Sequence, residues 1–220
     1  MNRNHFRFLL ASTITVTILS TARAQLFQWA PESGGNGHYY QPVVAPAGIS
    51  WTAASSAAQA MGGYLVTVTS AAENAFVFSL IDAPGYWFSG STVHNYGPWI
   101  GAYQPDPSSE PAGGWQWVNG DGDLNSTFSS WWSGEPNDMH YETAPNGEDF
   151  AHFGRPNSPT LRDATWNDLP DLPTFFVEDG VLVRSYVVEF NAVPEPSTIG
   201  VVVGMGLGTW AARRQWKRRA

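Results

Sequence analysis

Polar and apolar positions follow two different periods along the first half of the chain. Residues 49–63 combine a serine N-cap, a run of alanines and a closing pair of glycines, which predicts a helix. Residues 64–68, YLVTV, alternate and are rich in β-branched residues, so they predict a strand. Ser70 and Glu73 form an S-x-x-E capping box before apolar residues at helical spacing, which predicts a second helix.

Farther along, the helical period gives way to short aromatic segments. They predict strands at residues 86–91, 98–103, 113–120 and 184–190. Between Asn119 and Ser185 lies a long stretch rich in Asp, Asn, Gly, Ser and Pro, with little periodicity. A structureless loop of that length is uncommon unless it is functional, and bound ions could order it. Two helices followed by short strands predict an α+β domain.

The two ends of the chain differ from this body. Residues 1–24 place two arginines before an apolar stretch and end in Ala-Arg-Ala, the order of a secretory signal peptide; a buried N-terminal helix is the alternative interpretation. Residues 199–212 are apolar but shorter than the ~20 residues of a transmembrane helix, and the basic cluster that follows is expected to stay cytoplasmic. We therefore expect a signal peptide at 1–24, a domain at 25–192 and a sorting segment at 193–220.

The C-terminal segment has a recognisable order of parts. Residues 193–198 read VPEPST, and a short apolar span and a cluster of arginines follow. This order resembles the PEP-CTERM sorting signal of Gram-negative bacteria. The resemblance implies that an exosortase processes the tail, that the precursor is transiently anchored in the inner membrane, and that the mature protein reaches the cell surface or the extracellular matrix. Such a signal determines the location of a protein in the cell and does not indicate its activity.

Charge and composition narrow the function of the body. Residues 25–192 hold three Arg, no Lys and 18 acidic residues, hence a formal net charge of −15, which excludes nucleic acid as a partner. Nine of the 11 Trp lie in this body and argue against disorder. The absence of cysteine excludes thiol catalysis and zinc–thiolate sites. The core must therefore form without disulfides.

Eight short motifs occur in one order and together resemble the C-type lectin-like domain, over roughly residues 36–190. They are Trp-x-x-Ala from Trp51, Gly-Gly-x-Leu from Gly62, Ser-x-x-Glu-x-x-Phe from Ser70, Trp-Ile-Gly from Trp99, Trp-x-Trp-x-x-Gly from Trp115, Glu-Pro-Asn from Glu135, Gly-Glu-Asp from Gly147 and Trp-Asn-Asp from Trp166. The resemblance implies a C-type lectin-like α+β fold with two helices, short antiparallel strands and a long calcium-binding loop. Phe150 stands where the family usually has a cysteine, and we interpret it as a core replacement for half of a disulfide.

The resemblance also implies a principal calcium site formed by Glu135, Asn137, Glu148, Asn167 and Asp168. Calcium takes six to eight oxygen ligands of this kind. The same five residues would bind carbohydrate, because sugar hydroxyls can donate to a carboxylate and accept from an amide. Asx turns and solvated loop acids are the alternative explanation. Glu-Pro-Asn implies mannose-, glucose- or fucose-type sugars rather than galactose, and a cis Glu135–Pro136 bond.

Two further questions concern the acidic residues around this site. A second calcium site, as in some relatives, could be formed by Asp106, Glu110, Asp138 and Asp149, with Glu148 shared between the two sites. The alternative is that these residues are ordinary solvent-facing acids. The interval from Asn137 to Glu148 is about five residues longer than is usual in the family. Glu142, which lies within this interval, could therefore compete with Glu148 as a ligand.

The sequence predicts an exported, calcium-dependent carbohydrate-binding protein whose partner is an extracellular polysaccharide or glycan. The alternatives are a calcium-stabilised adhesion or protein-interaction module without sugar binding and, less favoured, a carbohydrate-active enzyme. We expect no enzyme, since no H-x-x-x-H, G-x-S-x-G or P-loop motif occurs, although two acids would suffice for a glycosidase. Residues 121–125 begin like an EF-hand loop, but the required Gly and Glu are missing.

Overall fold

The computed structural model describes residues 25–88, 94–106, 109–140, 147–155, 158, 160–171, 174–175 and 181–193. The predicted signal peptide, Glu142 and nearly all of the sorting segment lie outside these residues. Within the described part of the chain, no helix has the length and apolar character needed to cross a membrane.

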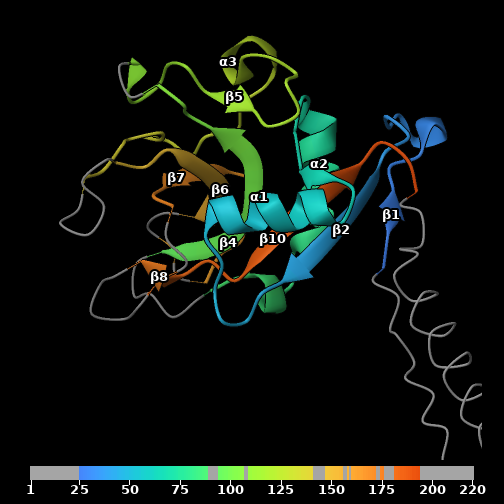
Figure 1. The fold of residues 1–220 in the computed structure, drawn as a ribbon, viewed down its shortest axis with the longest axis horizontal. Helices are drawn as coiled ribbons and strands as arrows, with labels where there is room; N and C mark the ends of the chain where they lie inside the picture. The colour runs from blue at the N-terminus through green and yellow to red at the C-terminus, as the bar shows by residue number, and fades with distance from the viewer. Residues whose placement is uncertain are drawn as a thin grey trace, which may run out of the picture.

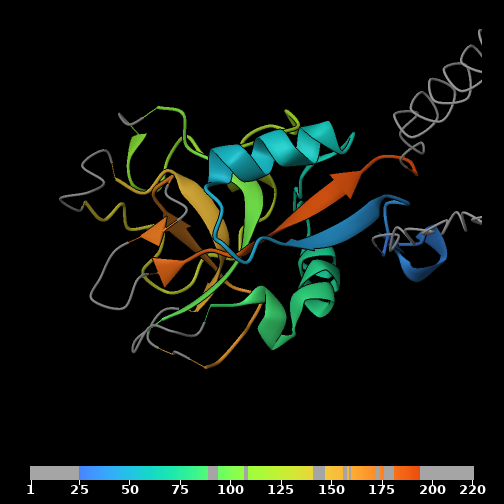
Figure 2. The same cartoon turned by 60° about the horizontal axis from the view of Figure 1, so that its bottom comes forward.

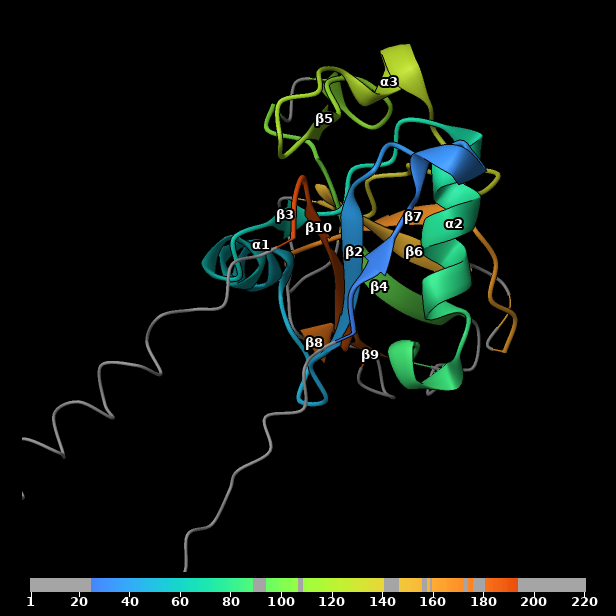
Figure 3. The ribbon, with the colours of Figure 1, turned by 90° about the vertical axis from the view of Figure 1, so that its right-hand side faces the viewer.

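Two helices lie on opposite faces of one sheet, as the views along different axes show (Figures 1, 2 and 3). They are α1 (Trp51–Ala60) and α2 (Ala71–Ile81). The strands of the sheet follow the spatial order β1 (Phe27–Gln28), β2 (Tyr39–Val44), β10 (Ser185–Phe190), β4 (Asn95–Tyr103), β6 (Phe150–Arg155) and β7 (Trp166–Leu169). Two short strands pair outside this path, β3 (Tyr64–Leu65) with β10 and β5 (Gln116–Trp117) with β4. Smaller elements complete the described fold: η1 (Pro31–Ser33), η2 (Pro84–Tyr86), α3 (Leu124–Thr127), β8 (Thr174–Phe175) and β9 (Val181–Leu182).

Both predicted helices are confirmed, and serine caps each of them. The Ser50 side chain accepts a hydrogen bond from the Ala53 N–H at 3.3 Å, and Ser70 accepts one from the Glu73 N–H at 3.2 Å. The Glu73 carboxylate accepts from the N–H of Thr69 at 2.8 Å, whereas a capping box would direct it to the N-cap residue itself. The hydrogen bond from the Glu73 N–H to the Ser70 side chain therefore forms as in a capping box. The return hydrogen bond to the Glu73 carboxylate comes from Thr69, one residue before the N-cap.

The strand predictions hold less well. The predicted strand at 64–68 shortens to β3, and Tyr86 belongs to η2 rather than to a strand at 86–91. Strands β6 and β7 lie inside the stretch with little periodicity. The sequence did not predict them, because their stability comes from pairing with neighbours rather than from an apolar alternation. The sheet is also mixed rather than wholly antiparallel, since β10 pairs with β4 in parallel.

The core is aromatic, as the composition predicts. Trp99, Trp115, Trp117 and Trp166 are all buried. Phe150 packs on the ring of Trp51 with 4.7 Å between ring centroids, which agrees with its interpretation as a core residue.

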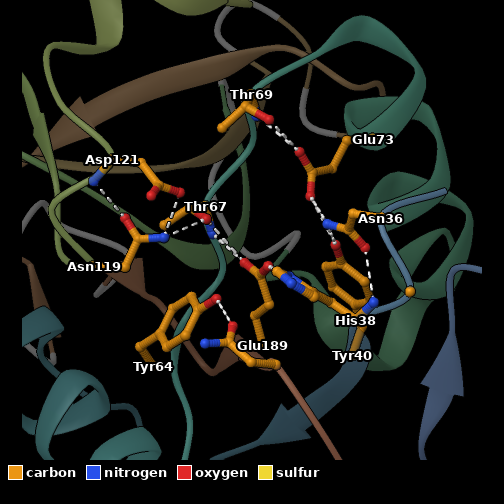
Figure 4. A network of polar contacts seen from close by, with 12 residues as sticks. Asn36, His38, Tyr40, Tyr64, Thr67, Thr69, Glu73, Asn119, Asp121 and Glu189 are labelled. Atoms are coloured by element: carbon orange, nitrogen blue, oxygen red, sulfur yellow. Dashed lines mark hydrogen bonds and ion pairs between the residues drawn. The ribbon is translucent and has the colours of Figure 1, made fainter.

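The antiparallel strands β1 and β2 form an N-terminal hairpin, and a polar network ties it to the rest of the described fold (Figure 4). The Tyr40 hydroxyl donates to the Glu73 Oε1 at 2.7 Å, and His38 Nδ1 lies 2.6 Å from Oε1 of the buried Glu189. The other oxygen of Glu189 accepts from the Thr67 N–H at 2.9 Å. Because the hairpin supplies partners to two buried acids, it is an integral part of the domain.

Candidate functional site

Strand pairing brings three distant segments to one place. In the β6–β7 ladder, Ala151 lies opposite Asp168 and Phe150 opposite Leu169, so the residues just before β6 lie beside the end of β7. The Trp132 N–H donates to the Trp166 carbonyl at 2.9 Å, which aligns the segment after Trp132 with β7. The Glu-Pro-Asn, Gly-Glu-Asp and Trp-Asn-Asp motifs therefore meet in space.

The fully buried Asp168 is the centre of this arrangement. Its Oδ2 accepts from the N–H of Asn137 at 3.1 Å and from the N–H of Asp138 at 2.9 Å. Its carboxyl group also lies close enough to that of Glu135 for each to affect the pKa of the other. Asp168 thus fixes the backbone on both sides of Asn137 and brings two acids together.

Glu135 lies half-buried beside Asp168. Its N–H donates to the Trp132 carbonyl at 2.9 Å, and its peptide bond to Pro136 is cis, as predicted. Burial, together with the nearby charge of Asp168, raises the pKa of Glu135 to about 7. Oε2 of Glu135 is buried and has no hydrogen-bond partner among the described residues. This carboxyl group therefore holds unused acceptor capacity.

Glu148 forms hydrogen bonds with the residues that follow Asn137. Only 2% of Glu148 is exposed, and its Oε2 accepts from the N–H of Met139 at 3.1 Å. In return, the Glu148 N–H donates to Oδ1 of Asp138 at 3.0 Å. The same Met139 N–H lies 3.1 Å from Oδ1 of Asn137. Glu148 therefore lies next to the Glu-Pro-Asn segment in spite of the long interval between them.

The amide NH₂ group of Asn167 is engaged within the protein. Its Nδ2 donates to the backbone carbonyl of Asp168 and lies 3.3 Å from Nε2 of His152. His152 is 1% exposed, and burial lowers its pKa to about 3. The sequence motifs gave no indication of His152, since only the pairing of β6 with β7 places it against Asn167.

The residues of the predicted second site are partly assembled. Burial raises the pKa of Glu110 to about 7, and the charges of Asp138 and Asp149 act in the same direction, which places these acids near one another. Both carboxyl oxygens of Glu110 are buried without a hydrogen-bond partner in the described part of the chain. Asp106 is exposed, and its carbonyl accepts from the Ser109 N–H at 3.2 Å.

The chemistry of these donors suits a hard cation. Among the described residues, the Asp, Glu and His side chains form no group of three placed to hold a metal ion. However, three buried carboxyl oxygens of Glu110 and Glu135 have no hydrogen-bond partner in that same part of the chain. An unpaired buried carboxylate is costly unless a cation or donor meets it. Carboxylate and amide oxygens are the ligands that calcium takes, so the residues fit this ion.

Comparison with known proteins gives one family. The family model of the lectin C-type domain matches residues 47–170. The perlucin-like protein of Mytilus galloprovincialis is 34% identical over 124 residues, which are 56% of this chain and 64% of that protein. The human C-type lectin domain family 10 member A is 33% identical over 121 residues, 55% of this chain and 30% of that protein. The chain thus spans less than two thirds of these curated relatives. The crystal structure of human lithostathine aligns with a TM-score of 0.47 and 24% identity, covering 81% of this chain and 99% of that one.

Proposed function

The chain belongs to the C-type lectin domain family, and from this we propose that its domain at residues 25–192 binds carbohydrate with the help of calcium. One observation carries the proposal: buried Asp168 gathers Glu135 and the backbone of Asn137 and Asp138 at one point. Carboxyl oxygens of the Glu-Pro-Asn and Trp-Asn-Asp motifs lie together there, which supports this proposal. An ion held at this point would pair with the unused carboxyl oxygens.

The residues of the site have separate roles in this proposal. Glu135, Asn137, Glu148, Asn167 and Asp168 would hold the calcium ion. Once bound, the ion supplies open coordination positions for two adjacent sugar hydroxyls. The Glu135 carboxylate then accepts a hydrogen bond from one hydroxyl, and the Asn137 amide donates one. Glu-Pro-Asn supports mannose-, glucose- or fucose-type sugars over galactose. We expect binding without turnover.

A monosaccharide panel tests the sugar proposal. The mature domain is titrated with mannose, glucose, fucose and galactose, once in calcium and once after calcium removal. We expect weak binding of the first three in calcium only. Preference for galactose, or equal binding with and without calcium, would contradict the proposal.

An observation at Asn167 favours the alternative of a calcium-stabilised interaction module. Its amide group already donates within the protein and is not free to donate to a sugar. Asn137→Asp separates the two functions, because a carboxylate still binds calcium but cannot donate to a hydroxyl. We expect this variant to lose sugar binding and to keep its calcium-dependent rise in melting temperature. If both effects persist unchanged, Asn137 does not bind sugar.

Calcium itself is tested by thermal unfolding. The expected dissociation constant lies on the order of 10⁻⁴–10⁻³ M, as for other extracellular modules. At a calcium concentration of 100 times this constant, linkage predicts about 2.7 kcal/mol of added stability. An unchanged melting temperature would leave an interaction module without calcium as the function.

We also propose a cellular location for the protein. The predicted signal peptide at 1–24 supports export, and the VPEPST segment with its basic tail supports exosortase processing at the inner membrane of a Gram-negative bacterium. The mature domain would then reach the cell surface or the extracellular matrix. Expression of the full chain with and without an exosortase tests this, because only the processed form should lose residues of the tail.

A further inference from the structure

One buried histidine contacts the candidate site without belonging to any of the motifs. His152 lies in β6 directly opposite Asn167 in β7, and on its other side it lies opposite Trp99 in β4. Directly opposed residues of antiparallel strands project their side chains on one face within contact distance. Trp99, His152 and Asn167 therefore form one row across three strands, which leads from the core to the site.

Aromatic neighbours hold the imidazole ring of His152 in this row. Tyr96 stacks on the ring with 5.8 Å between centroids and 15° between planes. Trp99 meets it edge to face at 5.7 Å and 72°. His152 is 1% exposed, so protein atoms surround the ring. Its Nε2 is thereby fixed towards the side chain of Asn167.

Gly154 provides the space that this contact needs. A Cβ atom at Gly154 would lie 2.7 Å from Cε1 of His152 and 2.8 Å from Cβ of Asn167. Separations this short would force one of the two side chains to move. The glycine in β6 therefore allows the imidazole and the amide to lie together.

The contact determines which way the Asn167 amide faces. Its Nδ2 meets two acceptors, the Asp168 carbonyl and the His152 Nε2, so the NH₂ group is fixed on the protein side. The amide is planar, and its oxygen must therefore face away from these two acceptors. Partners in the second coordination sphere orient metal ligands in this way, and their loss typically costs 10- to 100-fold in metal affinity.

We propose that His152 is a positioning residue that orients the Asn167 amide with its oxygen towards the calcium position and withholds its NH₂ group from the sugar. The calcium part of this inference rests on the proposed function. The orientation of the amide does not, since it is a property of the protein before any ion binds.

His152→Phe removes the acceptor and keeps a ring between Tyr96 and Trp99, whereas His152→Gln keeps an acceptor. In the calcium-free protein, side-chain amide NMR signals of Asn167, identified by their absence in Asn167→Asp, should shift and exchange faster with water in His152→Phe. Calcium affinity should fall by about tenfold or more in that variant. His152→Gln should stay closer to the wild type in both measurements.

Phe153→Leu is the control for a loss of stability without a loss of orientation. Phe153 is a buried neighbour on the opposite face of β6, so this variant should unfold more easily but keep the Asn167 signals and the calcium affinity. Unchanged Asn167 signals in His152→Phe would overturn the inference, as would equal losses in His152→Phe and His152→Gln. If the wild type binds no calcium, the proposed function fails and the amide signals alone decide the inference.

Discussion

At the scale of single residues, the candidate site brings buried acidic side chains close together. Glu135 lies near Asp168, and burial raises the pKa of Glu135 to about 7. Burial likewise raises the pKa of Glu110 to about 7. In the absence of an ion, the folded protein therefore keeps protons on these groups at pH values where the unfolded chain has lost them.

The first prediction concerns pH in the calcium-free protein. Because the folded pKa of Glu135 lies above the unfolded value of 4.5, its ionisation opposes folding as pH rises from about 4.5 to about 7. Glu135→Gln imitates the protonated form, so the variant should be at least as stable as the wild type at pH 8 and should lose that advantage at pH 5. Urea unfolding at both pH values measures this.

Exposed Glu32, in η1 and far from the site, supplies the control for this experiment, as Glu32→Gln. A Glu135→Gln variant whose advantage over the wild type is larger at pH 5 than at pH 8 would contradict the raised pKa.

Individual residues also show where sequence reasoning stops. The buried tryptophans and the cis Glu135–Pro136 bond were predictable, because bulk apolar content and a resemblance in motif order indicate them. His152 was not, since nothing in its neighbourhood along the chain marks it. Its role depends on lying opposite Asn167 in a strand pair that only the folded chain creates.

At the scale of elements, local signals determined what could be predicted. Both helices carry their own N-caps and propensities, so residues a few positions apart specify them. Strands β6 and β7 contain His, Gly, Asn and Asp, and no period of two is visible in them. They exist because β4 offers β6 a partner and β6 offers one to β7, which is information from distant parts of the chain.

The second prediction compares two residues at the start of α2. Ser70→Ala removes one cap and should cost about 1 kcal/mol of unfolding free energy. Glu73→Ala leaves the hydroxyl of Tyr40 and the N–H of Thr69 without their acceptor and should cost about 3 kcal/mol or more. Urea denaturation measures both values. Tyr40→Phe removes one donor to Glu73 and one acceptor for the Asn36 amide, which keeps Glu73 Oε1 as an acceptor, so this variant should fall near the lower value. Equal losses in Ser70→Ala and Glu73→Ala would contradict the importance of the network.

At the scale of the whole molecule, one sheet joins the first and last described strands of the chain. Strand β10 is buried along its length and lies between β2 and β4. Phe190 pairs with Tyr39 and Phe27 pairs with Tyr40, so the first and last strands of the described sheet both pair with β2 (Figure 2). The parallel pairing of β4 with β10 joins two strands that are far apart in the sequence, and no local sequence pattern predicted it.

The third prediction follows from this sheet and concerns truncation. A chain of residues 25–192 should fold as the full domain, because it keeps every strand of the sheet and every residue of the Glu73 and Glu189 network. Residues 47–170, the part that matches the family model, should not fold alone. That fragment lacks β1, β2 and β10, and it leaves β4 without its parallel neighbour and Leu65 without its partner Val188.

Circular dichroism and amide NMR of the two chains measure the difference. The longer chain should show dispersed signals and one cooperative unfolding transition. The shorter chain should show neither, since the apolar faces of β4 and α1 would be left open to water. A cooperatively folded 47–170 fragment would show that the N-terminal hairpin and the last strand are additions to the domain rather than parts of its core.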